Sequence, residues 1–585
     1  MPAFLAAALA LAAYALGYRF YSRWLGNRVF QLDPKAVTPA HSRRDDIDFL
    51  PTRPLILFGH HYASIAGLAP MLGPAVAVFW GWLPALLWVV FGALLIGCVH
   101  DFSALVLSSR HRGESIGALC QSILGPFAKG LFLALIFFGV ALAMGVFVEV
   151  ISVLFSWGAD FNPQALSQAT TSFPEAVLPS AGLMLLAMAA GYALYVKKKP
   201  LLPVTLIGFS LLLALIYAGY RWPTMGVQDR NAWPVKEGWT WILLAYAYAA
   251  SVLPVWLLLQ ARDFLNSLLL ALGLVLMYLG FFLIGPEFEA PAIHADPEGA
   301  PPIFPFVFIT IACGAASGFH SLVSSGTTAR QLDKETHARP IGYGAMIGES
   351  LLALMAVLAC TTTLGGKEAW AKVYVNWSAV QSLGAKLGIF IRGSASFIEE
   401  LGVTHDLAVT LVAMVVVSFA LTTLDSATRL LRFNVEEIGA SWQRLPVLGR
   451  LGRLMQNRFI ATGIACAAIG FFAFYKTQVP DDRVPGGFRL QSAGLTLWTL
   501  FGSTNQMIAG LALMTGTVYL KQKGRSYWPL AIPAVFMTLN TLGALTMKIL
   551  DFYQQSQWLL LALASLLVSI GLGVGFTAIQ ALRRS

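Results

Sequence analysis

The chain has 585 residues, of which 57% are hydrophobic and 12% are charged, and its mean hydropathy is +0.69. Because a soluble domain carries about a quarter charged residues, this composition excludes a water-soluble globular protein. The formal net charge of +10 does not indicate a nucleic-acid partner, since the basic residues are spread over short loops. The five cysteines show no CxxC or other metal-ligand spacing, so neither a zinc site nor a disulfide framework is predicted.

Apolar runs of about 20 residues recur along the chain, each long enough to cross a bilayer core of roughly 30 Å. The first, which begins at Pro2, has no Lys or Arg before it and therefore predicts a spanning helix, not a cleaved signal peptide. We predict about fifteen transmembrane helices, and hence an all-α polytopic protein whose surroundings are the lipid bilayer. The predicted spans are 2–19, 60–80, 83–108, 127–156, 176–196, 201–219, 238–261, 267–285, 303–326, 341–364, 405–427, 459–475, 493–520, 528–547 and 557–580.

Basic residues are unevenly distributed between the two sets of loops that alternate along these spans. Of the 39 Lys and Arg residues, 28 lie in loops after odd-numbered spans or in the C-terminal tail. Since cytoplasmic loops carry the excess of positive charge, we expect the N-terminus outside and the C-terminus inside. In a bacterial inner membrane the N-terminus would be periplasmic.

Two of the predicted spans are interrupted by helix-breaking or polar residues. The second contains Gly67, Pro70 and Gly73, and the ninth has a centre crowded with Ser317, Gly318, His320, Ser321 and Ser324. Proline and glycine weaken a helix, and lipid cannot satisfy the freed backbone groups. Both spans are therefore predicted to be broken helices that border protein or a water-filled cavity.

The charge-derived topology makes these two spans run in opposite directions. Paired broken helices of opposite direction are typical of inverted-repeat carriers, whose substrate site lies between the breaks. Close packing of small residues is the alternative explanation. We predict that the eight residues named above bind substrate, and that half-helix N-termini favour a carboxylate. Residues 60–458 would form the transporter core, after a first helix with its cytoplasmic loop (1–59) and before the C-terminal helices (459–585).

Ionisable residues occur within three predicted spans, at Asp101, Glu349 and Asp425. Such residues by default mark an ion or substrate pathway. A pair between Asp425 and Arg429, four residues further along the same helix, is the alternative for this carboxylate.

Hydroxyl and carboxylate oxygens gather around Asp425, and such hard ligands suit a small cation. We predict coupling to sodium or protons at this place, with no other metal and no cofactor. Two adjacent histidines in the second span and Asp101 are further candidates, as a proton relay. The predicted coupling residues are Thr422, Thr423, Asp425, Ser426, Asp101, His60 and His61.

Other functional classes find less support. Residues 113–117 match GxSxG, but they lie in a loop after a spanning helix, whereas a nucleophile elbow needs a strand-to-helix turn. The sequence contains no HExxH and no phosphate-binding P-loop, so neither a zinc protease nor an ATP-driven pump is predicted. A channel or a nutrient sensor stays open as an alternative, and a bis-histidine haem protein is a remote one.

Several stretches, in order along the chain, resemble the carbon starvation protein A family of membrane transporters. They lie between about residue 18 and residue 525, and comprise 57–61, 100–102, 253–259 with 262–263, 313–320, 325–328, 341–344, 424–429 and 500–506. The Thr-Thr-x-Asp-Ser cluster after the second broken helix also resembles the amino acid–polyamine–organocation superfamily.

The resemblance implies uptake of a nutrient, a peptide or pyruvate, across the bacterial inner membrane during carbon starvation. It also implies ion coupling, most naturally to protons. At the level of fold it implies two inverted five-helix repeats of the LeuT-like kind, in which the second, ninth and eleventh spans would be core helices one, six and eight. Two additional helices would then lie in the first half.

Overall fold

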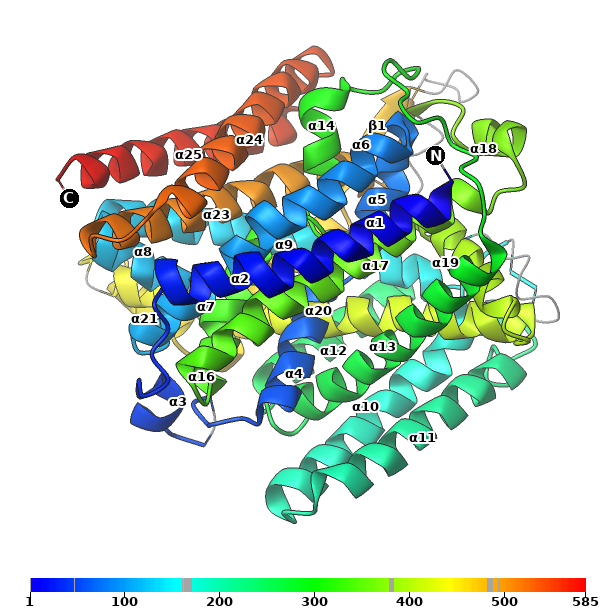
Figure 1. Cartoon of the computed structure of the whole chain (residues 1–585), viewed down its shortest axis with the longest axis horizontal. Coiled ribbons are helices and arrows are strands. Elements are labelled where there is room, and N and C mark those ends of the chain that lie inside the picture. Colours follow the sequence, from blue (N-terminus) through cyan, green and yellow to red (C-terminus); the bar gives the residue numbers. More distant parts are fainter. Residues whose placement is uncertain are drawn as a thin grey trace.

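The computed structural model describes residues 2–46, 48–159, 161–162, 171–377, 383–443, 445–480, 488–492 and 494–584. Most of this is helix, as predicted (Figure 1). The departure from an all-α chain is a short antiparallel hairpin, in which β1 (Lys476–Pro480) pairs with β2 (Phe488–Ser492).

The helices of the first half are α1 (Ala3–Leu16), α2 (Ser22–Trp24), α3 (Pro39–Ser42), α4 (Pro54–Ala66), α5 (Ala69–Ala77), α6 (Trp82–Leu87), α7 (Cys98–Arg110), α8 (Ile116–Leu124), α9 (Pro126–Phe155), α10 (Val177–Gly191), α11 (Leu201–Arg221), α12 (Lys236–Val252) and α13 (Leu259–Ile284). Those of the second half are α14 (Ile303–Thr310), α15 (Gly318–Val323), α16 (Ala329–Gln331), α17 (Gly344–Thr362), α18 (Lys367–Val373), α19 (Leu383–Glu399), α20 (His405–Trp442), α21 (Gly449–Met455), α22 (Arg458–Ala473), α23 (Gly494–Gln522), α24 (Trp528–Gln554) and α25 (Trp558–Arg584). Wider π-helical turns continue several of them, at Gly17–Tyr21, Leu25–Val29, Trp88–Gly97, Tyr192–Val196, Ser324–Thr328 and Arg339–Tyr343.

Every one of the fifteen predicted spans contains helix, but not every helix is long and apolar enough to cross a membrane. Within the described residues, ten helices meet that requirement, or eleven if α4 and α5, bent by 41° at their junction, count as one span. The other four predicted spans correspond to α12, the α14–α15 pair, α22 and α23. The count of fifteen crossings therefore stays a prediction. The predicted boundary at residue 59 falls inside α4.

The loops predicted to share one side of the membrane do lie together. Segments that follow the first, third and ninth spans are joined by contacts of 3.0 Å or less, namely Thr52 N to Gln331 O, Arg110 Nε to Glu335 Oε1, and His41 Nε2 to Asp333 Oδ1. Segments that follow the second, eighth and tenth spans meet through Trp82 N to Pro291 O and Trp377 N to Glu298 O. The two termini lie at opposite ends of the molecule (Figure 1).

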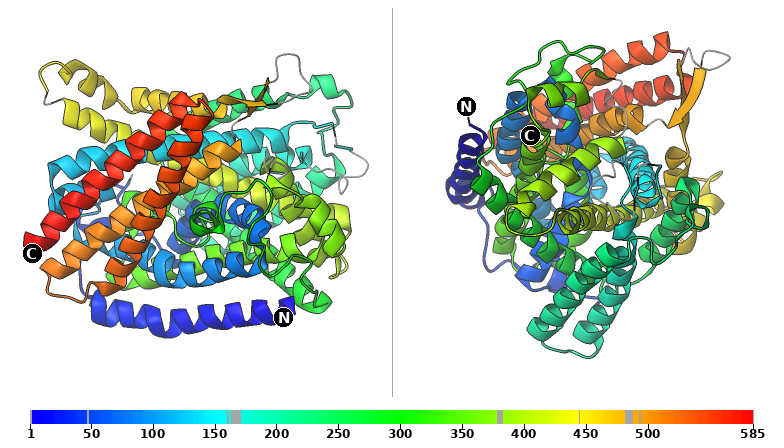
Figure 2. Two further views of the ribbon diagram at one scale, coloured as in Figure 1. Left: turned by 90° about the horizontal axis from the view of Figure 1, so that it is seen from above. Right: turned by 90° about the vertical axis from the view of Figure 1, so that its right-hand side faces the viewer.

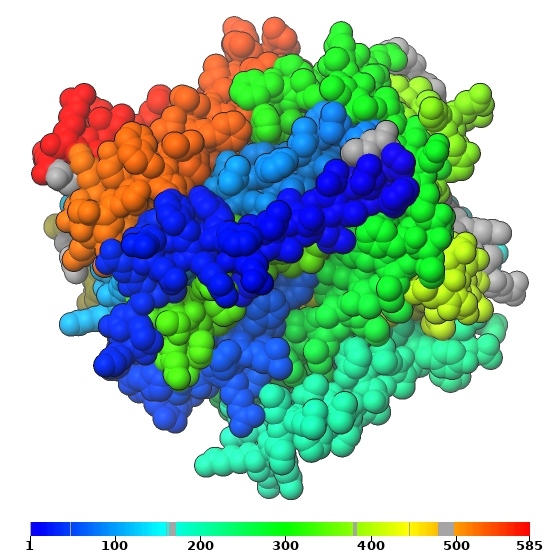
Figure 3. Space-filling model, in the orientation of Figure 1, coloured from blue at the N-terminus to red at the C-terminus, as the bar shows by residue number. Residues whose placement is uncertain are grey.

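Helix α20 occupies the centre of the bundle, between the α10–α11 pair at one edge and the α24–α25 pair at the other (Figures 1 and 2). Of the most apolar 18-residue window of each helix, 89% is buried in α20 but only 17% in α11. Helix α1 crosses the outside of the bundle (Figure 3). A helix that is apolar on its exposed faces fits contact with lipid, whereas α20 is surrounded by protein.

The two broken helices pack antiparallel in this interior. Thr52, just before α4, donates its backbone N–H to the carbonyl of Gln331, which ends α16, over 3.0 Å. At the other end, Trp80 Nε1 donates to the carbonyl of Pro301, just before α14, over 3.1 Å. The start of each broken helix thus meets the end of the other, which confirms the predicted opposite directions.

Candidate functional site

The first break lies between α4 and α5, and α20 packs into it. Gly67 ends α4 with φ of +39° and ψ of −158°, a conformation that favours glycine. A Cβ at Gly67 would come 2.7 Å from Thr423 Oγ1. That hydroxyl donates to the carbonyl of Ser64, over 3.2 Å, and so satisfies one of the groups freed at the helix end.

The second break separates α14 from α15, and it is bridged from two neighbouring helices. Asn505 of α23 accepts the Phe319 N–H at its Oδ1, over 2.9 Å, and its Nδ2 donates to Ser317 Oγ, over 3.0 Å. Glu349 of α17 accepts the N–H of Gly314, whose φ is +86°, over 3.0 Å. Backbone groups that lipid could not satisfy are thus held by side chains.

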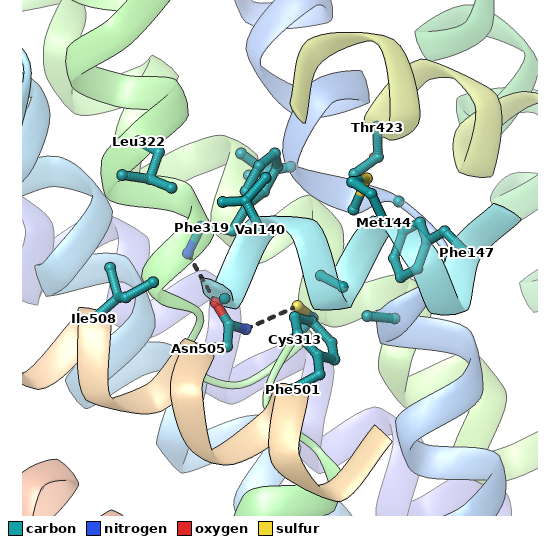
Figure 4. A pocket seen from close by; sticks show the side chains of 15 residues that line it. Val140, Met144, Phe147, Cys313, Phe319, Leu322, Thr423, Phe501, Asn505 and Ile508 are labelled. Atoms are coloured by element: carbon teal, nitrogen blue, oxygen red, sulfur yellow. Dashed lines mark hydrogen bonds between the residues drawn. The ribbon is translucent and has the colours of Figure 1, made fainter. Parts of the chain in front are cut away.

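A small cavity of about 20 Å³ lies between the two breaks. Its walls come from both breaks and from α9, α20 and α23 (Figure 4). Most lining side chains are apolar, and Asn505 and Thr423 add polar groups. The lining residues are Ile65, Gly67, Ala69, Gly139, Val140, Ala143, Met144, Phe147, Cys313, Phe319, Leu322, Thr423, Phe501, Asn505 and Ile508. Such a place suits a small molecule with an apolar body and one group that hydrogen-bonds.

Beside the first break, Asp425 belongs to a buried network of charges. Arg262 donates to its carboxylate, as does the hydroxyl of Tyr246. Arg262 also lies 3.4 Å from Asp263, whose other oxygen is 2.7 Å from His60 Nδ1. The alternative pair of Asp425 with Arg429 is wrong, because Arg429 donates instead to the backbone carbonyls of Ala250 and Leu253.

The hydroxyls predicted to join Asp425 at a cation site point in different directions. Thr422 accepts from Asn266 Nδ2, over 2.8 Å, whereas Thr423 faces the first break. Ser426 lies 3.2 Å from the hydroxyl of Ser64. In this structure the guanidinium of Arg262, and not a ring of hydroxyls, neutralises Asp425.

Further along the same interior, Asp101 and Glu349 each pair with a histidine. His61 Nε2 lies 2.9 Å from Asp101 Oδ2, and Ser324 donates to the other oxygen of Asp101. His320 Nε2 lies 2.9 Å from Glu349 Oε2, although without the alignment of a hydrogen bond. Asp101, Glu349 and both histidines are 0% exposed.

The residues predicted to bind substrate fall into three groups. Gly67 lines the cavity, and Ser317 is held by Asn505 at its edge. His320 and Ser324 belong to the acid–histidine pairs. The others serve close packing: a Cβ at Gly73 would come 2.6 Å from Thr310 O, one at Gly318 would come 2.2 Å from Asn505 O, Pro70 packs against Gly314, and Ser321 donates to Gly318 O.

Sequence reasoning gave no role to Asn505, Arg262 or Tyr246, and it placed Glu349 on an ion or substrate pathway without naming it among the binding or coupling residues. Asn505 is a polar residue within an apolar run, and Arg262 and Asp263 are adjacent charges near a span end. These signals were visible, but their partners lie on helices distant in the sequence. Only the folded arrangement connects them.

A model of the family described as carbon starvation protein CstA matches residues 2–371 and 367–544 of the chain. The chain belongs to this family. The peptide transporter CstA of Campylobacter jejuni is 31% identical, over 93% of this chain and 80% of its own length. The pyruvate/proton symporter BtsT of Escherichia coli is also 31% identical, over 94% of this chain and 83% of its own. The predicted family resemblance is thereby confirmed.

Solved structures similar to this CstA-family chain are distant in sequence. The Eremococcus coleocola manganese transporter, in complex with an aromatic bis-isothiourea substituted compound, is 12% identical, covers 92% of this chain and 99% of its own, and has a TM-score of 0.41. MhsT in complex with L-phenylalanine is 13% identical, covers 84% of this chain and 99% of its own, and has a TM-score of 0.42. Because both TM-scores lie below 0.5, nothing about the CstA-family site is taken from either structure.

Proposed function

We propose that this CstA-family protein imports a small carboxylate-bearing nutrient, pyruvate or a short peptide, across the bacterial inner membrane together with protons. The observation that carries the proposal is the cavity between two antiparallel broken helices, with one buried acid–histidine pair behind its wall and two more in the same interior. Relatives named as peptide transporters and as a pyruvate/proton symporter support the same substrate class. Alternating access would expose this cavity first to the outside and then to the cytoplasm.

The composition of the cavity favours the smaller substrate. In this conformation the cavity measures about 20 Å³, room for roughly one water molecule, so it must widen to admit substrate, and a small substrate requires the least widening. None of the described residues that line it is Lys or Arg. A single carboxylate held by uncharged donors at the helix breaks, with an apolar remainder against Phe319 and Phe501, fits pyruvate better than a tripeptide.

Charge balance favours protons over sodium as the coupling ion. Four buried carboxylates, those of Asp101, Asp263, Glu349 and Asp425, share this interior with two buried guanidiniums, and this leaves two negative charges uncompensated. The guanidiniums belong to Arg262 and Arg429. Buried charges require partners. Three histidines, His60, His61 and His320, lie beside three of these carboxylates, where a proton would balance negative charge without a bound metal ion.

Uptake of labelled pyruvate into proteoliposomes tests the proposal, under an inward proton gradient or an inward sodium gradient, with di- and tripeptides as competitors. We expect saturable accumulation that a proton gradient drives and a sodium gradient does not. Accumulation driven by sodium alone would contradict the choice of ion. Movement without accumulation would favour a channel, and binding without movement would favour a sensor.

A further inference from the structure

Glu349 contacts both sides of the second break. One carboxylate oxygen accepts the N–H of Gly314, inside the break, over 3.0 Å. The other lies 2.9 Å from Nε2 of His320, in the half-helix that follows the break. A single carboxylate on α17 therefore holds together two segments whose relative position defines the break.

Neither His320 nor Glu349 has all of its hydrogen-bonding positions satisfied. Both ring nitrogens of His320 and one oxygen of Glu349 lack a hydrogen bond to any part of the chain that the structure describes, although all are fully buried. Buried polar groups are normally paired, and exceptions often mark functional sites. An acid and an imidazole in contact, with spare positions on both, can hold a proton in more than one way.

The surroundings of the pair are also titratable. Cys98, His100 and Asp101 of α7 face it, as do Tyr62 of α4 and Cys313 of the break. Asp101 interacts electrostatically with both His320 and Glu349. Among these neighbours of the pair, only His100 can become positively charged, and an imidazole carries that charge only when it is protonated.

The pair lies directly behind the cavity wall. Cys313 and Phe319 line the cavity, and their immediate neighbours in the chain, Gly314 and His320, are the two contacts of Glu349. A molecule in the cavity would therefore touch the same two short segments that Glu349 holds from behind.

We propose that His320 and Glu349 form a proton-binding site that sets the geometry of the second break, and so links proton binding to substrate binding across the cavity wall. An ionised Glu349 holds the Gly314 N–H by a charge-assisted hydrogen bond, which is roughly twice as strong as the neutral one left after protonation. A proton arriving at Glu349 thus loosens the break, and a proton leaving it tightens the break. The link to substrate rests on the function proposed above; the proton site itself does not.

The first test needs no substrate: amide hydrogen exchange of peptides covering residues 311–319, in the full-length protein, from about pH 5 to pH 8, where imidazoles titrate. The wild type is compared at each pH with Glu349→Gln, whose neutral amide mimics the protonated acid. We expect the two to exchange alike at low pH, and the wild type to be slower by about threefold or more at high pH. If the ratio of the exchange rates of Glu349→Gln and the wild type stays constant from pH 5 to pH 8, the proposal is overturned.

Glu175→Gln is the matched control. Glu175 is also fully buried, and neither of its carboxylate oxygens has a hydrogen bond within the described residues, but it lies in the 3₁₀ turn just before α10, away from the break. In this variant, the amide hydrogen exchange of residues 311–319 should match that of the wild type at every pH. If Glu349→Gln does not fold, His320→Gln takes its place. The pH at which hydrogen exchange of residues 311–319 changes should then differ between His320→Gln and the wild type.

Transport separates failure of this site from failure of the proposed function. In proteoliposomes, Glu349→Gln should lose proton-driven accumulation by about tenfold or more, whereas pyruvate exchange, which needs no net proton movement, should fall by a much smaller factor. Absence of pyruvate and peptide uptake in the wild type would end the proposed function and leave the exchange test to decide the proton site. Normal accumulation by Glu349→Gln would end the proposed coupling.

Discussion

Asp425 shows what sequence spacing can and cannot reveal about a buried charge. Its depth in an apolar segment was visible, and so was a neighbour of the right sign four residues away. The real partner, Arg262, is 163 residues distant and comes from α13. Local spacing identifies only partners on the same helix, so the sequence could indicate that Asp425 needs a partner but could not choose it.

Asp425→Asn should destabilise the protein by roughly 3–5 kcal/mol, because it leaves the Arg262 guanidinium buried without a counter-charge. Thermal unfolding in detergent measures the effect. The double variant Asp425→Asn with Arg262→Gln should recover a large part of the loss, since it removes both charges together. If the loss of stability in the double variant equals the sum of the losses in Asp425→Asn and Arg262→Gln, the two side chains do not stabilise each other.

Asn505 provides a residue-scale test of the cavity. Asn505→Asp keeps the acceptor for the Phe319 N–H but places a negative charge at the cavity wall. The affinity for pyruvate should fall about tenfold or more, a change of about 1.4 kcal/mol. The affinity for pyruvamide, a neutral ligand of similar shape, should fall less. Competition by both compounds for labelled pyruvate measures the difference. Equal losses would indicate general damage and not repulsion of a carboxylate.

At the scale of elements, the two broken helices were predictable because their cause is local. Glycine, proline and small polar residues within an apolar run are visible in one segment at a time. The number of membrane crossings was harder: α12 and α22 are helical, but length and composition do not decide whether they span. The close packing of Gly73 on α14 and of Gly318 on α23 also required the neighbouring helix to be in place.

Gly67→Ala should impair transport more than folding. The positive φ disfavours any side chain by roughly 1–3 kcal/mol, and the new Cβ would meet Thr423 Oγ1 at 2.7 Å. We expect uptake to fall by about tenfold with only a modest loss of thermal stability. Gly543→Ala is the control, because it lies in helix α24 with nothing within 4 Å of the added Cβ, and it should transport normally. Normal uptake by Gly67→Ala would show that the first break need not keep this conformation.

At the scale of the whole molecule, the distribution of Lys and Arg predicted which loops share a side, and the contacts between those loops agree with it. The excess of basic residues recurs in the loops after odd-numbered spans along the entire chain, and one missed or added span would have reversed the pattern downstream of it. Which of the two faces is cytoplasmic is still a prediction.

Labelling of single introduced cysteines with a membrane-impermeant maleimide tests that orientation. In cells with an accessible inner membrane, Asp296→Cys should react directly, and Arg44→Cys should react only after permeabilisation; both positions are exposed. Four of the native cysteines are buried, and replacement of the half-buried Cys466 by serine removes the remaining background. The reverse pattern would invert the predicted topology.

The antiparallel contacts between the broken helices have a mechanical consequence. Thr52 is tied to Gln331 on one side of the molecule, and Trp80 to Pro301 on the other. Each side therefore contains a pair of half-helices, one from each broken helix, that are hydrogen-bonded to each other at their outer ends and connected to their own continuations only through the breaks. We therefore expect such a pair, and not a whole helix, to move as a unit: one pair would swing away from the cavity while the opposite pair stays closed, without a continuous pore.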